Sequence, residues 1–162
     1  MIWIQPEHPK QLTAIFRNLM NVYLSDIFSE CDPIWTLFIL EAAPSLQNFG
    51  LSRSRHLCLR TPEDIAEKTN VVWEPSKDFK HLNLKFLQMI GFLEEDKVTT
   101  YIRLVMERAV GLKKIELQGY RPCRGYNASD PNRKSQVDEA SRRRIKERLE
   151  HGSSSSVEIV IC

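Results

Sequence analysis

Aliphatic residues recur along the chain in the pattern L-x-x-L-x-L, with other apolar residues allowed at each L position. The four copies are Leu19-Val22-Leu24, Leu46-Phe49-Leu51, Leu84-Leu87-Met89 and Leu112-Ile115-Leu117. The second half of each copy alternates apolar and polar residues, which is typical of a β-strand with one buried side. The aliphatic residues therefore face a core. The intervening residues face outward, namely Asn21, Tyr23, Asn48, Gly50, Phe86, Gln88, Lys114 and Glu116.

The spacing of the four copies indicates internal repetition. Their first residues are separated by 27, 38 and 28 residues. Two of these spacings fall in the range of roughly 20–29 residues that is typical of leucine-rich repeats. The segment 40–51 also aligns without gaps on 106–117, at an offset of 66 residues. The longer middle spacing places an insert at about 52–78.

Helical patterns lie between the predicted strands. Asp32 and Pro33 suit the cap and first turn of a helix that Pro44 ends, so a helix is expected over 33–43. A second helix is expected from about Asp96 to Val110, with Gly111 as its C-terminal cap. Further predicted elements are a strand at 2–4, helices at 9–18, 61–68 and 135–150, and a strand at 157–161.

Parallel strands need a crossover connection, and these helices supply it. One such unit cannot bury its apolar side alone, whereas stacked units share a continuous core. The sequence therefore predicts an α/β fold, a leucine-rich-repeat solenoid. Short parallel strands would line one face and helices the other, and a C-terminal helix and strand would close the solenoid.

Charge is nearly balanced over the 162 residues, with 23 Lys and Arg against 21 Asp and Glu. The segment 113–148 nevertheless carries a net charge of +6, which leaves −4 for the rest. Five basic residues of this segment lie on the predicted C-terminal helix: Arg142, Arg143, Arg144, Lys146 and Arg148. They are candidates for a nucleic-acid-binding patch. The alternative is a solvated helix whose acidic residues partly balance the charge.

The sequence offers no catalytic constellation. His56 and Cys58 lie two residues apart, but nothing marks a base contact or an oxyanion hole, so an unreactive pair is the simpler interpretation. The four cysteines and four histidines show no metal-ligand spacing, and no phosphate-binding glycine loop is present. We therefore expect a protein that is not an enzyme and has no cofactor or metal.

The lack of a secretory signal and of a long apolar stretch indicates the cellular compartment. The N-terminal residues lack a basic region followed by an apolar core, so they do not read as a secretory signal. The longest apolar stretch, 34–40, is far shorter than the ~20 residues that span a bilayer. We expect a cytoplasmic or nuclear protein that does not bind membranes.

The outward strand residues are the remaining candidates for function, because solenoids bind partners across such extended faces. The partner-binding candidates are Asn21, Tyr23, Asn48, Phe86, Gln88, Lys114 and Glu116. The alternative is that these side chains are the solvated or partly covered side of the sheet.

Three stretches of the chain resemble a known family. Residues 79–92 with 101–117, and the ending 141–149 with 157–161, resemble the FBD module that closes many plant F-box/leucine-rich-repeat proteins. Residues 24–46 are similar to the repeats that precede this module. The resemblance implies leucine-rich-repeat-like units over 1–78 and an FBD-like module over 79–162, continuous in one solenoid.

The family also implies a role. Its members are similar to substrate-recognition subunits of SCF-type ubiquitin ligases, in which the repeats hold the protein to be ubiquitinated. The resemblance thus implies a protein partner or ubiquitination substrate. It leaves contact with a Skp-type adaptor in doubt, because no F-box precedes the repeats in this sequence.

Overall fold

The computed structural model describes residues 9–54, 76, 78–119, 138–151 and 156–162. The helical elements are α1 (Pro9–Phe16), the 3-10 helix η1 (Pro33–Thr36), α2 (Leu37–Ala42), α4 (Asp96–Arg108) and α5 (Glu139–Glu150). The strands are β1 (Asn21–Phe28), β2 (Asn48–Ser54), β3 (Phe86–Ile90), β4 (Lys114–Gln118) and β5 (Glu158–Ile161). The strand and helix predicted at 2–4 and 61–68 lie outside the described residues.

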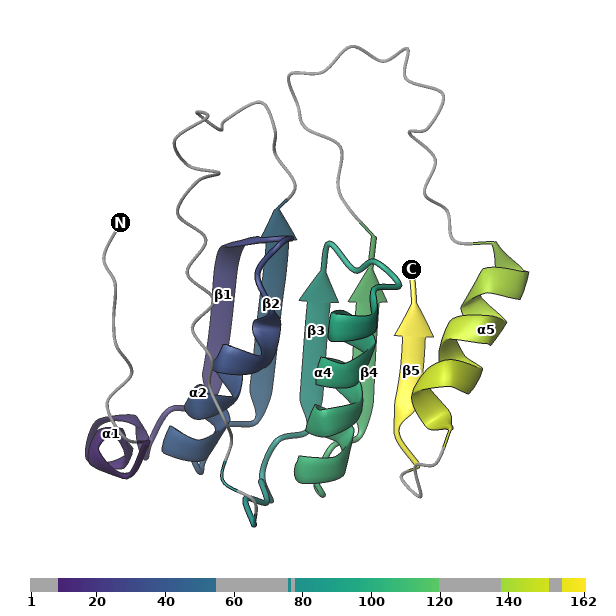
Figure 1. Cartoon of the computed structure of the whole chain (residues 1–162). Coiled ribbons are helices and arrows are strands. Elements are labelled where there is room, and N and C mark those ends of the chain that lie inside the picture. The colour runs from purple at the N-terminus through teal and green to yellow at the C-terminus, as the bar shows by residue number, and fades with distance from the viewer. Residues whose placement is uncertain (1–8, 55–75, 77, 120–137, 152–155) are drawn as a thin grey trace, which may run out of the picture.

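The strands form one parallel sheet in the order β1-β2-β3-β4-β5. Figure 1 shows α2, α4 and α5 on the same side of this sheet. We call this side the covered face and the opposite side the open face. The expected α/β class, with parallel strands and helices, is confirmed.

The covered face forms the core. Four rows of paired strand residues can be followed across the sheet, and two of them contain apolar side chains on this face. These rows are Val22-Phe49-Leu87-Ile115-Ile159 and Leu24-Leu51-Met89-Leu117-Ile161. In β2 to β5 every member of the two rows is buried. The alternation of apolar residues in the sequence therefore identified the inward side correctly.

The helix boundaries follow from local capping. The Asp32 side chain accepts a hydrogen bond from the backbone N–H of Ile34 at 2.9 Å, as its position in the sequence predicts. The helix expected over 33–43 is divided, however, because its first turn is the 3-10 helix η1. At the other end of the chain the Asp138 side chain accepts from the N–H of Ser141 at 2.7 Å. Helix α5 consequently begins at Glu139 rather than at residue 135.

Gly111 has a different role from the one expected. The C-cap residue of α4 is Ala109, and Gly111 lacks the positive φ of a glycine cap. A Cβ atom at Gly111 would lie 2.2 Å from the backbone oxygen of Leu82. The glycine is therefore needed because the lead-in to β3 passes close to the lead-in to β4.

Buried polar side chains connect the layers. The Tyr101 side chain of α4 is fully buried, and its hydroxyl lies 2.9 Å from the Thr36 hydroxyl. Thr36 donates its one hydroxyl proton to the Pro33 carbonyl at 2.8 Å, so Tyr101 donates to Thr36. Burial is the main cause that raises the pKa of Tyr101. The pair joins α4 to η1.

His81, which lies in the lead-in to β3, connects that segment to the ends of α2 and α4. Its Nδ1 accepts from the backbone N–H of Leu84 at 3.0 Å, so this nitrogen carries no proton. Its Nε2 therefore donates to the Ala43 carbonyl, also at 3.0 Å. The backbone N–H of His81 donates to the Arg108 carbonyl at 2.8 Å. Desolvation is the main cause that lowers the pKa of this imidazole.

Candidate functional site

The seven partner-binding candidates lie together on the open face. The parallel register places them in two neighbouring rows that cross the sheet. One row is Asn21-Asn48-Phe86-Lys114, which Glu158 of β5 extends. The other is Tyr23-Gly50-Gln88-Glu116, which Val160 extends. The sequence therefore identified a contiguous surface, although the four candidates on β3 and β4 are half-buried rather than fully exposed.

The members of the two rows that lie on β1 and β2 are uncharged. The Asn48 amide donates to the Oδ1 of Asn21 at 2.6 Å, across neighbouring strands. This pair leaves an amide oxygen and N–H groups of the two side chains available to a ligand. Such groups suit recognition of a polypeptide backbone, which offers the same donors and acceptors.

Tyr23 lies across Gly50. Its side chain covers the place where a larger residue would project, because a Cβ atom at Gly50 would lie 2.3 Å from the Tyr23 Cδ2. Gly50 lies on the open face, as the sequence pattern predicts, but it is buried because the Tyr23 ring covers it. Tyr23 itself stays 53% exposed. The result is a flat aromatic platform at one end of the face, of the kind enriched in protein interfaces.

The β3–β4 half combines the half-buried Phe86 with polar side chains that bond to one another. Glu116 accepts hydrogen bonds from the side-chain amides of Gln88, at 3.3 Å, and Gln118. The Lys114 ammonium lies 4.0 Å from the other carboxylate oxygen of Glu116. These bonds hold the side chains in place before any ligand arrives, which lowers the entropy cost of binding.

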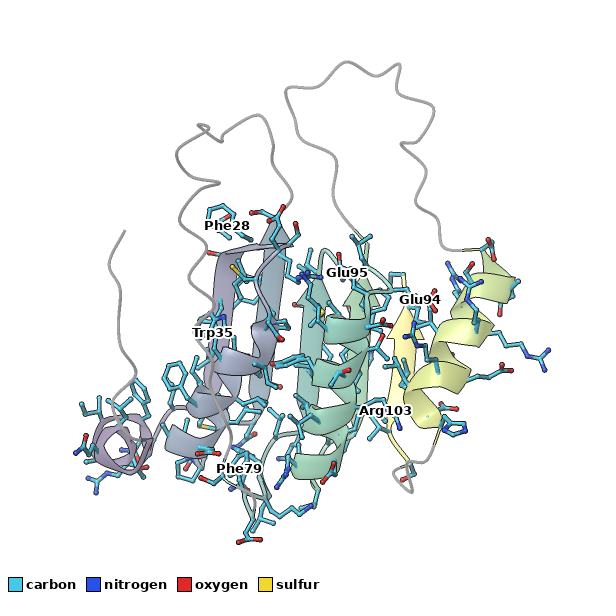
Figure 2. The ribbon with its side chains drawn as sticks, viewed as in Figure 1. Phe28, Trp35, Phe79, Glu94, Glu95 and Arg103 are labelled. Atoms are coloured by element: carbon cyan, nitrogen blue, oxygen red, sulfur yellow. The ribbon has the colours of Figure 1, made fainter. Side chains whose placement is uncertain are left out.

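The basic residues of α5 meet carboxylates. Arg144 and Arg148 reach the acidic stretch at the start of α4. Arg144 binds Glu94 at 2.9 Å, and Arg148 binds both Asp96 and, at 3.5 Å, Glu94. Figure 2 shows Glu94 on the side of α4 that faces α5. The hydrogen bond from Arg144 is the main cause that lowers the pKa of Glu94.

Two more of these cations pair within their own helix. Arg143 binds Glu147 at 2.9 Å and Arg142 binds Glu139 at 3.8 Å. Of the five basic candidates, Lys146 alone has no ion pair with a described residue. The +6 segment and the −4 remainder are thus joined by ion pairs, and the basic helix is not an uncompensated cationic surface.

Sequence reasoning missed a buried ionic group. Arg53 follows Phe49 and Leu51 on the covered face, where the alternation predicts an apolar residue. Its side chain is fully buried and donates to the Ser29 carbonyl and, at 3.0 Å, to Glu95. Lys97 lies 3.5 Å from the same carboxylate and donates to the carbonyls of Ser29 and Glu30. The position of an arginine at an inward site of a predicted strand was the feature of the sequence that could have indicated this buried group.

The contacts of this ionic group indicate a role in holding the fold together. Two of the three guanidinium nitrogens of Arg53, Nε and Nη1, have no partner among the described residues and are shielded from solvent. Figure 2 shows Glu95 toward the centre of the sheet, away from Glu94 and α5. The group joins the ends of β1 and β2 to the start of α4.

The remaining features considered in the sequence are the His56–Cys58 pair, a metal site and a membrane-spanning segment. His56 and Cys58 lie outside the described residues. Within the described part of the chain, no three His, Cys, Asp or Glu side chains are close enough to hold a metal ion. No described helix is long and apolar enough to cross a membrane.

Comparisons with known proteins add no family. No protein-family model matches the chain, and no curated protein or solved structure matches it.

Proposed function

We propose that this chain is a non-enzymatic protein-interaction module with leucine-rich-repeat-like units, and that it binds a protein partner through the open face. The observation that carries the proposal is the assembly of all seven candidates in two adjacent rows of one sheet. The sequential order of the parallel strands supports the repeat architecture, because each strand pairs with the next along the chain.

The chemistry of the face favours a protein over other ligands. Tyr23 supplies an aromatic contact and the Asn21–Asn48 pair supplies neutral amide groups. Gln88, Glu116 and Lys114 add fixed polar groups of both charge signs. A surface that combines aromatic residues, here Tyr23 and Phe86, with a mixed polar surround is typical of specific protein interfaces.

A ubiquitin-ligase role is the finer part of this proposal. It rests on the resemblance to F-box/FBD/leucine-rich-repeat proteins, whose repeats hold the protein to be ubiquitinated. In this view the open face holds the substrate, and an F-box makes the contact with the Skp-type adaptor. The arginines of α5 are mostly engaged in ion pairs, so the structure lends no support to nucleic-acid binding over a protein partner.

The test is quantitative affinity capture from plant cell extract with three forms of the chain. The double variant Tyr23→Ser with Phe86→Ser alters the open face, and Thr100→Ala alters an exposed position of α4. We expect a specific partner that the unmodified chain and Thr100→Ala retain equally and the double variant loses. Equal capture by all three forms would refute binding through the open face.

The ligase role has a separate readout. An F-box fused ahead of the chain should bring the captured partner to the ligase. The partner's ubiquitination should then rise with the unmodified chain and stay at background with the double variant. Unchanged ubiquitination, despite retained partner binding, would reject the ligase role and leave the interaction module intact.

A further inference from the structure

A groove runs along the outer edge of the sheet, between β5 and α5. Its volume is about 570 Å³. All four residues of β5 line one side of it. Six residues of α5 line the other, and all of them are charged: Glu139, Arg142, Arg143, Lys146, Glu147 and Glu150. Figure 1 shows α5 beside β5, with no described strand beyond β5.

The backbone of β5 offers unpaired groups to this groove. The N–H of Glu158 donates to the Lys113 carbonyl, and the N–H of Cys162 donates to the Leu117 carbonyl. In a parallel ladder every second residue bonds to the same neighbouring strand. The N–H and C=O groups of Ile159 and Ile161 therefore point away from β4 and have no partner strand among the described elements.

We propose that this groove binds an extended peptide segment of another protein, which adds as a sixth strand to β5. Main-chain hydrogen bonds to Ile159 and Ile161 supply the pairing, and α5 forms the wall beside the added strand. The groove adjoins the open face at Glu158 and Val160, but it contains none of the seven partner-binding candidates, which lie on β1 to β4.

The wall of α5 decides what the groove accepts. A further helix-bearing unit, or a second copy of the chain that brings its own α5, would need an apolar helix surface to pack against. The apolar residues Ile145 and Leu149 are buried, and the groove side of α5 is charged. A single strand without its own helix needs no such surface.

The unpaired charges decide the side chains of the segment. Arg142 and Arg143 already bind Glu139 and Glu147. Lys146 and Glu150 have no ion pair within the described residues, and they lie one helical turn apart, about 6 Å along the axis. Residues i and i+2 of a strand lie about 6.7 Å apart and point to the same side. The segment therefore carries an acidic side chain opposite Lys146 and, two residues away, a basic side chain opposite Glu150.

The probe is a short synthetic peptide of alternating threonine and valine with a central Lys-Val-Glu, together with its Glu-Val-Lys counterpart. The two orders serve parallel and antiparallel addition respectively. The control peptide has the same sequence with N-methyl groups on the residues that pair with β5. We expect one of the two orders to bind in the micromolar to millimolar range, and the N-methylated peptide to bind at least tenfold more weakly.

Amide hydrogen exchange of the full chain locates the contact. At saturating peptide, exchange at Ile159 and Ile161 should slow at least tenfold, whereas Glu158 and Val160 should be protected with or without peptide. Lys146→Glu should weaken binding about tenfold, since it places like charges together. Lys85→Glu, which makes the same charge change at an exposed residue before β3, should leave affinity unchanged.

Three outcomes would overturn the proposal. The first is unchanged exchange at Ile159 and Ile161 with both peptide orders. The second is equal affinity of the N-methylated and unmethylated peptides, which would show that binding does not depend on main-chain hydrogen bonds to β5. The third is protection of the same amides that depends on protein concentration and accompanies dimer formation, which would make a second copy the occupant. None of these outcomes bears on the open face.

Discussion

The two faces of the sheet are built from the same five strands and follow opposite rules. On the covered face, apolar residues of β2 to β5 are buried in continuous rows, and the one charged residue among the inward positions of β2, Arg53, is engaged by Glu95. On the open face, neighbouring side chains bond to each other across strands and stay partly exposed. The covered face therefore contributes most to stability, while the side chains of the open face stay partly accessible to solvent.

The largest effect is expected at the centre of the covered face. Leu87 is fully buried between β2 and β4, so Leu87→Ala removes apolar contacts and leaves a cavity. We expect the free energy of unfolding to fall by about 2–5 kcal/mol, as measured by urea denaturation. A loss below about 1 kcal/mol would mean that the sheet is not packed as tightly as the burial of this residue indicates.

Arg53 tests the one charge on that face. Arg53→Ala leaves the Glu95 carboxylate without its buried partner, and we expect a loss of about 2–3 kcal/mol in urea denaturation, since Glu95 stays partly exposed. The double variant Arg53→Leu with Glu95→Gln replaces the ion pair by an apolar and a neutral group. It should recover most of that stability, and a double variant as unstable as Arg53→Ala would show that the ion pair itself is required.

His81 makes the stability of the buried layer depend on pH. Because burial lowers its pKa below the usual 6.5, the folded protein binds fewer protons here than the unfolded chain does. The contribution of His81 is therefore fully present above pH 6.5 and is lost as the pH falls below that value, with a slope of at most about 1.4 kcal/mol per pH unit.

The measurement is urea denaturation between pH 5 and pH 7, with His81→Leu as the reference. The stability difference between the two proteins should shift in favour of the unmodified chain as the pH rises. Parallel pH profiles would show that the imidazole titrates equally in the folded and unfolded states.

Gly50 and Tyr23 test packing on the open face. Gly50→Ala places a methyl group against the Tyr23 ring and should cost about 1 kcal/mol. In a Tyr23→Ala background the same change should be neutral or stabilising by about 0.5 kcal/mol, because alanine suits a strand better than glycine. Thermal denaturation of the unmodified chain, the two single variants and the double variant measures both effects of Gly50→Ala. If Gly50→Ala changes stability equally with and without Tyr23, contact with the ring is not the cause of the change.

The smallest effect is expected at Gln88, next to Leu87 in the sequence and on the opposite face. Gln88→Ala removes one hydrogen bond to a half-buried carboxylate. We expect the urea midpoint to change by less than the equivalent of about 0.5 kcal/mol, which is typical of surface substitutions. If Gln88→Ala were as damaging as Leu87→Ala, the two faces would not differ in the way described.

Much of the fold could be predicted because it depends on local spacing. Strand side chains alternate between two sides, so the L-x-x-L-x-L copies located β1 to β4 and separated core residues from outward ones. Asp32 caps a helix through a bond to a residue two positions away, as its place in the sequence predicts. The Asp138 cap is equally local, but the prediction missed it and began that helix at residue 135. Gly111 was misinterpreted, because the backbone that approaches it, at Leu82, lies in another segment.

The sequence by itself determined which side of the sheet each strand residue occupies. Only the tertiary structure decided where the charges meet. Three consecutive acidic residues, Glu94, Glu95 and Asp96, look alike in the sequence, yet Glu94 and Asp96 bind arginines of α5 while Glu95 binds the buried Arg53. Their partners lie more than forty residues away. An ion pair requires proximity in space, and packing of α4 against the sheet and beside α5 creates that proximity.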